Sequence, residues 1–377
     1  MHITREIIGS IKTELDRQQS KIIVIYGARQ VGKTTLVENV LTNNTDQKIL
    51  RINGDRIGNN TFISSRDLQK LESLVFGYDI LFIDEAQRIP EIGINLKILY
   101  DNIKNLKIIV TGSSSLDLAS SIKEPITGRK KQYTLHPISF LELSKIYNKY
   151  ELSQIIEERL IFGSYPEMFT IKNRVEKAKY ITELTEDYLY KDVLELENIR
   201  YHHKLRDLLR LLAFQIGSEV SLNELSNNLG LSKDTIARYI DLLEQSFVIF
   251  RLRGFSRNLR KEVNKKPKIY FYDLGIRNSL IDNFNDIDKR NDIGALWENF
   301  LIVERLKRNE YQSHLCSQYF WRTYTGAELD YIEEYGGKLF GYEFKWKKES
   351  KAPQSWLATY NGSFQCLNKE NFVDFIL

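Results

Sequence analysis

The first third of the chain alternates short apolar runs with longer amphipathic stretches. Five runs have the length and composition of strands, and they cover residues 21–26, 48–53, 80–83, 107–110 and 130–135. Several are almost continuously apolar, as expected for strands that helices cover on both faces. Helical periodicity appears between them, for example at 33–41 and 94–103. This alternation predicts an α/β unit with a parallel sheet over residues 1–136.

The pattern becomes helical after this unit. Residues 137–200 combine a period of 3.6 with many oppositely charged pairs at i,i+4, and a turn at 163–167 interrupts them. We therefore expect a small helical module in this part of the chain.

Residues 201–278 predict three helices and then two strands. The helices are expected at 204–216, 222–229 and 233–245, and the strands are FVIFRL and KIYFYD. Gly230 is a suitable C-cap for the second helix, and Ser232 is a suitable N-cap for the third. This order is typical of a winged-helix module.

The last segment, residues 279–377, again alternates helix-like and strand-like patterns. It predicts a helix at 294–308 and strands at 318–323, 328–333 and 338–345. A short helix and a final strand at 371–377 are expected to close an α/β domain.

Composition excludes several classes of protein. Hydrophobic residues make up 42% and charged residues 28% of the 377 positions, which is ordinary for a folded domain and not for a disordered or collagen-like chain. We expect no membrane helix, because no apolar run approaches the roughly 18 residues that a span needs. The N-terminus mixes both charge signs, unlike a signal peptide. The two cysteines, Cys316 and Cys366, do not make a disulfide or metal framework. We therefore expect a reducing, cytoplasmic location.

The net charge of +4 is mild but unevenly placed. Residues 251–268 hold eight basic residues and one acidic residue, a sum of +7, which leaves −3 for the rest of the chain. With Lys233 and Arg238 of the predicted recognition helix, this segment predicts a DNA-binding surface. The alternative is an ordinary solvated loop.

GARQVGKT, residues 27–34, follows a predicted strand and precedes a predicted helix, which is the context of a phosphate-binding P-loop. Lys33 is expected to reach the β- and γ-phosphates of ATP, and Thr34 to bind Mg²⁺. The residues expected to hold the nucleotide are Gly27, Ala28, Arg29, Gln30, Val31, Gly32, Lys33, Thr34 and Thr35. The alternative is a chance glycine-rich turn.

Two later strands end in polar residues that suit hydrolysis. ILFIDEAQ places Asp84 to hold Mg²⁺ and Glu85 to act as general base for the attacking water. KIIVTGSSS places Thr111 or Ser113 beside the γ-phosphate as a sensor. Simple strand-end caps and polar turns are the alternatives.

The C-terminal segment contains carboxylates at nuclease-like spacing. Glu343 and Lys345 are two residues apart on one strand, so they share a face, and Asp330 lies on the preceding strand. We expect Asp330 and Glu343 to bind a divalent ion, Glu298 to complete the metal shell, and Lys345 to act on the scissile phosphate. The alternative is an amphipathic strand pair with solvent-facing charges.

The Walker A loop, DEAQ, TGSSS, the GR that contains Arg129 and the phrase LHPISFLEL together resemble the AAA+ ATPases. With GSYPEM and ELDYIEEYGGKLFGYEFKW, nearly the whole chain is similar to a large bacterial and archaeal ATPase family with a C-terminal domain of unknown function. The resemblance implies a five-stranded sheet with a helical lid. It also implies that Arg129 is an arginine finger acting across a subunit boundary in a homo-oligomer. No sensor-2 arginine can be placed on the lid.

The C-terminal strands resemble the PD-(D/E)xK nuclease core, a restriction-endonuclease-like fold. Our leading interpretation is an AAA+ protein that hydrolyses ATP and couples nucleotide state to a DNA-directed half with Mg²⁺-dependent nuclease activity. The alternative is a nucleotide-dependent switch or scaffold whose C-terminal half binds nucleic acid or protein without cleavage. A helicase is set aside, because no second RecA-like domain follows.

Overall fold

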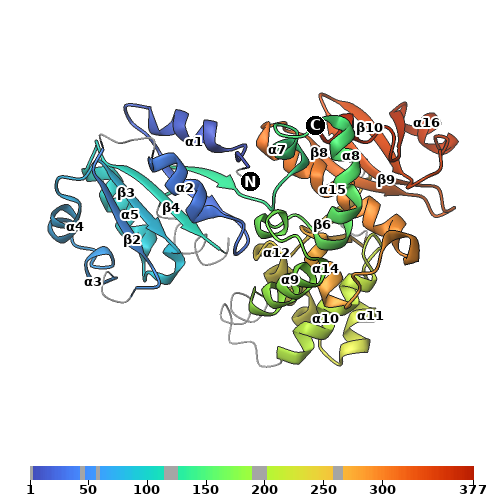
Figure 1. Cartoon of the computed structure of the whole chain (residues 1–377), viewed down its shortest axis with the longest axis horizontal. Helices are drawn as coiled ribbons and strands as arrows, with labels where there is room; N and C mark the ends of the chain where they lie inside the picture. Colours follow the sequence, from blue (N-terminus) through green and yellow to red (C-terminus); the bar gives the residue numbers. More distant parts are fainter. Residues whose placement is uncertain (1–2, 43–46, 57–59, 114–125, 189–201, 258–265) are drawn as a thin grey trace. The chain divides into compact units, whose positions relative to one another are not determined.

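The computed structural model describes residues 3–42, 47–56, 60–113, 126–188, 202–257 and 266–377. The chain divides into two compact units. The P-loop unit contains Thr4–His136, and the C-terminal unit contains Pro137–Glu244 and Val248–Leu377. Figure 1 labels their elements along the chain.

The P-loop unit is built on a five-stranded sheet in the order β2-β3-β4-β1-β5. All four neighbouring pairs are parallel, as predicted from the alternation of strands and helices. The strands are β1 (Ile22–Tyr26), β2 (Ile49–Asn53), β3 (Ile80–Asp84), β4 (Lys107–Gly112) and β5 (Lys130–Thr134). Because all five run the same way, their carboxyl ends meet at one edge of the sheet.

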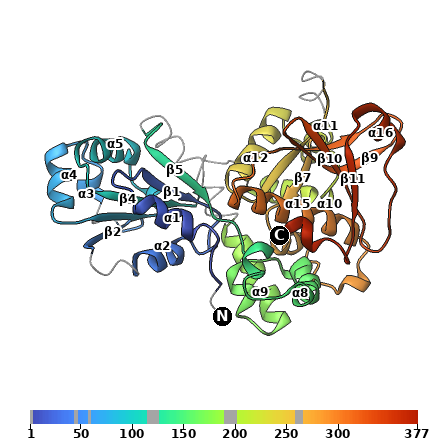
Figure 2. The same cartoon turned by 90° about the horizontal axis from the view of Figure 1, so that it is seen from above.

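Helices cover both faces of this sheet (Figure 2). They are α1 (Ile8–Leu15), α2 (Lys33–Thr42), α3 (Asn60–Ile63), α4 (Leu68–Val75) and α5 (Ile92–Asn102), with a short η2 (Ala86–Arg88) after β3. Every residue of β1 and β3 is buried, which explains why their sequences are continuously apolar. Alternate residues such as Val24 and Ile83 pack with Leu71 and Leu96 of α4 and α5.

The segment expected to form a lid is helical as far as the structure describes it. It contains α7 (Phe140–Leu143), α8 (Lys149–Phe162), η3 (Pro166–Phe169) and α9 (Arg174–Tyr188). Capping boxes begin α7 at Ser139 and α8 at Asn148. These helices pack against α14 (Leu274–Leu280), α15 (Ile293–Tyr311) and α17 (Val373–Ile376), so they are part of the C-terminal unit.

Three helices and two strands follow in the order that the sequence predicts. They are α10 (His202–Phe214), α11 (Leu222–Leu229), α12 (Lys233–Gln245), β6 (Ile249–Gly254) and β7 (Lys268–Phe271). Gly230 ends α11 with a left-handed φ of 62°. The two strands do not form a separate two-stranded wing, because β6 also pairs in parallel with β8 through Arg253 and Gly254. This pairing extends the sheet and satisfies backbone groups at the edge of β6.

The C-terminal unit contains a six-stranded mixed sheet in the order β11-β10-β9-β8-β6-β7. Its further elements are η5 (Ile287–Lys289), β8 (Ser317–Arg322), β9 (Glu328–Tyr335), β10 (Lys338–Phe344), α16 (Gln354–Tyr360) and β11 (Ser363–Leu367). Helix α15 packs against β7 and β10. Trp356 of α16 packs edge-on against Trp321 of β8, with ring centroids 5.5 Å apart.

The final strand predicted at 371–377 is wrong, because α17 occupies this segment. Phe372, Val373, Phe375 and Ile376 are buried. Their spacing of i, i+1, i+3 and i+4 places them on one side of a helix, whereas a strand would turn them to opposite faces. The helix packs against α8 and α15, which explains the burial.

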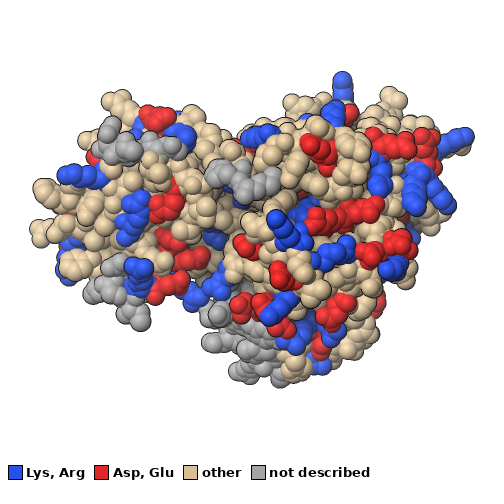
Figure 3. Space-filling view, in the orientation of Figure 1, with Lys and Arg blue, Asp and Glu red and all other residues tan. Residues whose placement is uncertain are grey.

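The surface carries both charge signs in mixture. Figure 3 shows Lys and Arg side chains interspersed with Asp and Glu over the visible face. Among the described residues, no helix combines the length and the apolar character needed to cross a membrane.

Candidate functional site

The loop between β1 and α2 has a backbone that requires glycine. Gly27 has a φ of 154°, and a Cβ there would lie 2.2 Å from the carbonyl oxygen of Leu135. Gly32 has a φ of 94°, in the left-handed half of the map. Lys33, the first residue of α2, is buried, and its Nζ donates to the carbonyl oxygens of Gly27 (2.9 Å) and Ala28 (3.0 Å). The loop and its lysine therefore form one compact unit before the helix.

Sequence reasoning missed Arg5, which anchors this loop. Its guanidinium donates to the carbonyl oxygen of Val31 (Nη1, 2.7 Å) and to that of His136. Arg5 therefore connects the P-loop to the chain just beyond β5. No local pattern marks Arg5, because both partners are backbone atoms that lie far from it in the sequence.

Asp84, at the end of β3, is bonded to the first turn of α2 and to the end of β4. Thr34 Oγ1 donates to Asp84 Oδ2 at 2.9 Å, and the Thr111 hydroxyl donates to Asp84 Oδ1. Strand β4 lies between β1 and β3, so Thr111 at its end is between the P-loop and Asp84. Hydroxyl and carboxylate oxygens are the hard ligands that Mg²⁺ prefers. The pairing of Thr34 with Asp84 therefore fits the predicted Mg²⁺ site.

Glu85 follows Asp84 in a left-handed conformation with a φ of 50°. Gly54 allows this turn to come close to β2, because a Cβ at Gly54 would lie 2.2 Å from the Glu85 carbonyl oxygen. The Glu85 side chain accepts a hydrogen bond from Gln87 Nε2 at 2.5 Å. The same Nε2 lies 3.0 Å from Ser113 Oγ. Gln87, which the sequence reasoning left without a role, thus connects the predicted general base to a predicted sensor.

Arg129 lies where the strands of the sheet begin, opposite their carboxyl ends. Its carbonyl oxygen accepts from the backbone N–H of Ile22 at 2.9 Å, at the amino ends of β1 and β5. Its guanidinium binds both carboxylate oxygens of Asp101, at 2.7 and 3.0 Å. The structure therefore does not bring Arg129 together with the P-loop of its own chain.

In the C-terminal unit, β9 and β10 bring Asp330 and Glu343 together. These strands are antiparallel and pair Tyr331 with Tyr342, so the next residues, Asp330 and Glu343, are opposite each other. The backbone N–H of Phe344 donates to Asp330 Oδ2 at 2.7 Å. Burial, followed by the charges of Glu298 and Glu343, raises the pKa of Asp330 well above its usual value.

Two lysines neutralise this carboxylate cluster. Lys345 Nζ lies 2.6 Å from Glu343 Oε1, and Lys268 Nζ lies 3.1 Å from Glu298 Oε1. Among the described residues, the ligand oxygens of Glu298, Asp330 and Glu343 do not all lie within 4.8 Å of one another. Glu298 is paired with Lys268, and its expected part in a shared metal shell stays a prediction.

The basic segment 251–268 is less uniform than its sequence indicates. Lys268 is only 3% exposed, so its assignment to a DNA-binding surface is wrong. Arg251 is ion-paired with Asp241 and Glu244 of α12. Three more basic residues, Arg260, Lys261 and Lys265, lie outside the described residues. The exposed basic residues that remain are Arg253, Arg257 and Lys266, with Lys233 and Arg238 on α12.

A second group of metal-ligand types lies at the start of β8. Ligand atoms of His314, Cys316 and Glu333 are within 4.8 Å of one another. Arg305 binds both carboxylate oxygens of Glu333, at 2.8 and 2.6 Å, and Asn309 Nδ2 donates to Glu333 Oε1 at 2.7 Å. The guanidinium already satisfies the carboxylate, so this group is a structural network.

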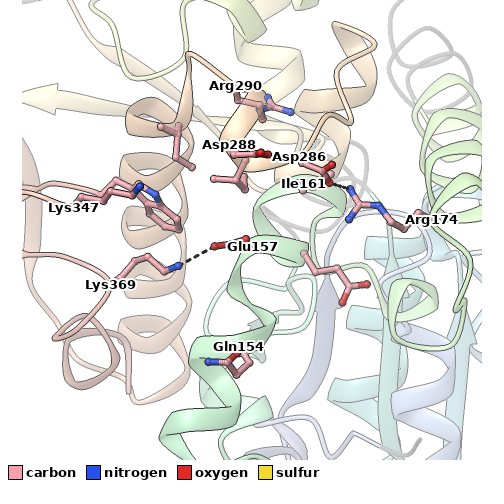
Figure 4. Close-up of a pocket in the computed structure, with 13 residues that line it drawn as sticks. Gln154, Glu157, Ile161, Arg174, Asp286, Asp288, Arg290, Lys347 and Lys369 are labelled. Atoms are coloured by element: carbon pink, nitrogen blue, oxygen red, sulfur yellow. Dashed lines mark hydrogen bonds and ion pairs between the residues drawn. The ribbon is translucent and has the colours of Figure 1, made fainter.

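A cleft of about 850 Å³ opens beside α8 in the C-terminal unit (Figure 4). Ion pairs line its walls, including Lys369 with Glu157 at 2.9 Å and Arg174 with Asp286 at 2.7 Å. Lys369 Nζ also lies 4.6 Å from the centre of the Trp346 ring. These side chains satisfy one another, and the cleft presents no predominant charge.

Comparisons with known proteins divide the chain in a similar way. A family described as "AAA domain" matches residues 19–144. Two families described as domains of unknown function match residues 153–287 (DUF8612) and 293–361 (DUF4143).

Several relatives are themselves uncharacterized proteins. One from Mycobacterium tuberculosis is 27% identical over 350 residues, covering 90% of this chain and 73% of the relative. One from Haemophilus influenzae is 23% identical, covering 76% and 74%. Among solved structures, a mutant of Thermotoga maritima RuvB aligns with a TM-score of 0.34 at 15% identity, covering 70% of this chain and 95% of RuvB. Residues 19–144, which contain the P-loop, are thus similar to a family described as an AAA domain, and the two matches that follow are to domains of unknown function.

Proposed function

We propose that the P-loop unit binds ATP with Mg²⁺ and hydrolyses it. The observation that carries this proposal is the hydrogen bond between Thr34 and Asp84, because it joins two motifs that lie 50 residues apart in the sequence. The residues proposed to hold the nucleotide run from Gly27 to Thr35. A buried lysine and two metal-binding oxygens at one sheet edge are the features that phosphoryl transfer requires.

Each residue of the site has a distinct proposed role. Lys33 balances the charge of the β- and γ-phosphates, and Thr34 and Asp84 hold Mg²⁺, which neutralises phosphate charge when bound. Glu85 orients the attacking water and accepts its proton. Thr111 fixes the carboxylate of Asp84, and Ser113 acts as the sensor that contacts the γ-phosphate.

We expect Lys33→Ala and Glu85→Gln to fail at different steps. Lys33→Ala should lose ATP binding, because it removes the buried cation proposed to balance the β- and γ-phosphates. Glu85→Gln should bind ATP normally and turn over roughly 10²–10⁴ times more slowly, because only the general base is lost. Fluorescent-nucleotide binding and phosphate release would measure the two steps, with Lys97→Ala, an exposed lysine of α5, as control. Wild-type turnover by Glu85→Gln would refute the role of Glu85.

We further propose that Arg129 completes the site of a neighbouring subunit. Its place at the amino edge of the sheet supports this, because that edge faces away from the P-loop of the same chain. The ion pair with Asp101 would then hold the guanidinium in one orientation when no neighbour engages it.

A mixing experiment tests the role of Arg129. Arg129→Ala and Glu85→Gln should each be nearly inactive, and equal amounts together should recover part of the wild-type turnover. Recovery is expected because some interfaces then join an intact Glu85 to an intact Arg129. Absence of recovery at every protein concentration would contradict action between subunits.

We also propose that the C-terminal unit acts on DNA. Exposed Arg253, Arg257 and Lys266, with Lys233 and Arg238 of α12, would contact phosphates. A second candidate activity, divalent-ion-dependent cleavage, is supported by the opposition of Asp330 and Glu343. Glu343 Oε2 is buried without a hydrogen-bond partner among the described residues, which fits a cation ligand. Lys345 would stabilise charge on the scissile phosphate.

Asp330→Asn separates cleavage from binding. With Mn²⁺, wild-type protein should nick DNA and bind it with an affinity that falls steeply as salt rises. Asp330→Asn should lose cleavage and retain salt-dependent binding, because it removes a metal ligand and leaves the basic side chains that would contact phosphates in place. Asp288→Asn, an exposed position, serves as control. Salt-dependent binding without cleavage by wild-type protein would support the alternative of a nucleotide-dependent switch or scaffold.

A further inference from the structure

Lys268 places a buried positive charge inside the carboxylate cluster of the C-terminal unit. Its side chain extends from β7 and is 4% exposed. Its Nζ lies 2.7 Å from Glu328 Oε1 and 3.1 Å from Glu298 Oε1. Burial by itself would lower the pKa of Lys268, but Glu298, Asp330 and Glu328 raise it above its usual value. The ammonium therefore stays charged.

The carboxylates of Glu298, Glu328, Asp330 and Glu343 are not equivalent. Glu298 Oε1 accepts from both Lys268 and the Tyr270 hydroxyl, the latter at 2.6 Å. Glu328 is paired with Lys268 through Oε1, and its Oε2 lies 3.7 Å from Nε of Arg322. Both carboxylates are thus neutralised by side chains of the protein.

Asp330 and Glu343 have less compensation. Asp330 accepts a hydrogen bond from the Phe344 backbone, and its charge is disfavoured by burial and by its acidic neighbours. Glu343 is paired with Lys345 through Oε1, while its buried Oε2 has no hydrogen-bond partner in the described part of the chain. These two residues therefore offer the oxygens that an additional cation would satisfy.

We propose that Lys268 is a built-in cation that occupies the place of a second metal ion. It holds Glu298 and Glu328, so that one divalent ion binds through Asp330 and Glu343. Glu298 is then a positioning residue for Lys268 and not a metal ligand. This inference rests on the divalent-ion site proposed above, and it fixes the number of ions that the site takes.

Lys268→Met tests the inference, because methionine retains the length of the side chain and removes its charge. The full chain is titrated with Mn²⁺ without nucleotide, in an Asp84→Asn background that lacks the proposed metal ligand of the P-loop unit. The protein with Lys268 should bind one ion, and the Lys268→Met protein should bind two. Lys268→Met should also melt at a lower temperature than its parent. Mn²⁺ should restore several degrees of that loss, because the second ion replaces the missing charge.

Two controls separate a charge effect from loss of packing. Lys307→Met removes another buried lysine, whose Nζ lies 2.7 Å from Glu304 Oε1. It should lower the melting temperature without rescue by Mn²⁺. Lys268→Arg keeps the charge and should still bind one ion. If Lys268→Met does not fold alone, it should fold when Mn²⁺ is present, and failure to do so contradicts the inference.

The failures of the two proposals can be distinguished. Suppose that the proteins with Lys268 and with Lys268→Met each bind one ion, and that Asp330→Asn abolishes this binding in both. The metal site would then be supported, but the role of Lys268 would be overturned. No ion in either protein would overturn the metal site and this inference together. If Lys268→Met bound an ion and the protein with Lys268 bound none, the lysine would replace the metal entirely. That result would contradict the proposal that one ion binds while Lys268 is present.

Discussion

The order of strands in the parallel sheet determines the chemistry of the P-loop unit. Strand β4 lies between β1 and β3, and all three end at the same edge. The Asp84 carboxylate accepts from Thr34 in the first turn of α2 and from Thr111 of β4, so the start of this helix and the ends of two strands form one connected group. The continuous burial of β1 and β3 holds this edge in register, and the glycines at 27 and 54 let the backbone come close where the side chains must meet.

The C-terminal unit uses a different constraint, which is charge balance inside a mixed sheet. The antiparallel register brings Asp330 opposite Glu343, and α15 adds Glu298. Such a group of carboxylates repels unless cations accompany it. Lys268 and Lys345 supply that charge from β7 and from the residue after β10. The same unit also pairs the buried carboxylate of Glu333 with Arg305.

Sequence patterns were sufficient for elements whose signal is local. Short apolar runs predicted the parallel strands, period-3.6 patterns predicted the helices, and the P-loop spacing identified Lys33 and Thr34. The spacing of Glu343 and Lys345 predicted a shared face, and the two side chains are in fact ion-paired. Local sequence patterns did not predict features that depend on contacts between residues far apart in the chain. Lys268 looks like part of a basic loop, and only the sheet reveals that it is buried among acids from β9 and α15.

Arg5 and Gln87 illustrate the same limit within the P-loop unit. Arg5 bonds to backbone carbonyls that carry no sequence signature, and the role of Gln87 depends on a hydrogen bond to Ser113, which is distant in the sequence. The error at 371–377 has another cause. A short segment rich in large apolar residues suits a strand or a helix, and its packing against α8 and α15 selects the helix.

We propose that the polar residues at the ends of β3 and β4 act together on bound ATP. A double-mutant cycle on ATP turnover with Gln87→Ala, Ser113→Ala and the double variant tests it most directly. We expect a coupling of about 1–2 kcal/mol, so that the double variant is little slower than the slower single variant. Rate losses that simply multiply would contradict the claim, because they would mean that Gln87 and Ser113 act independently.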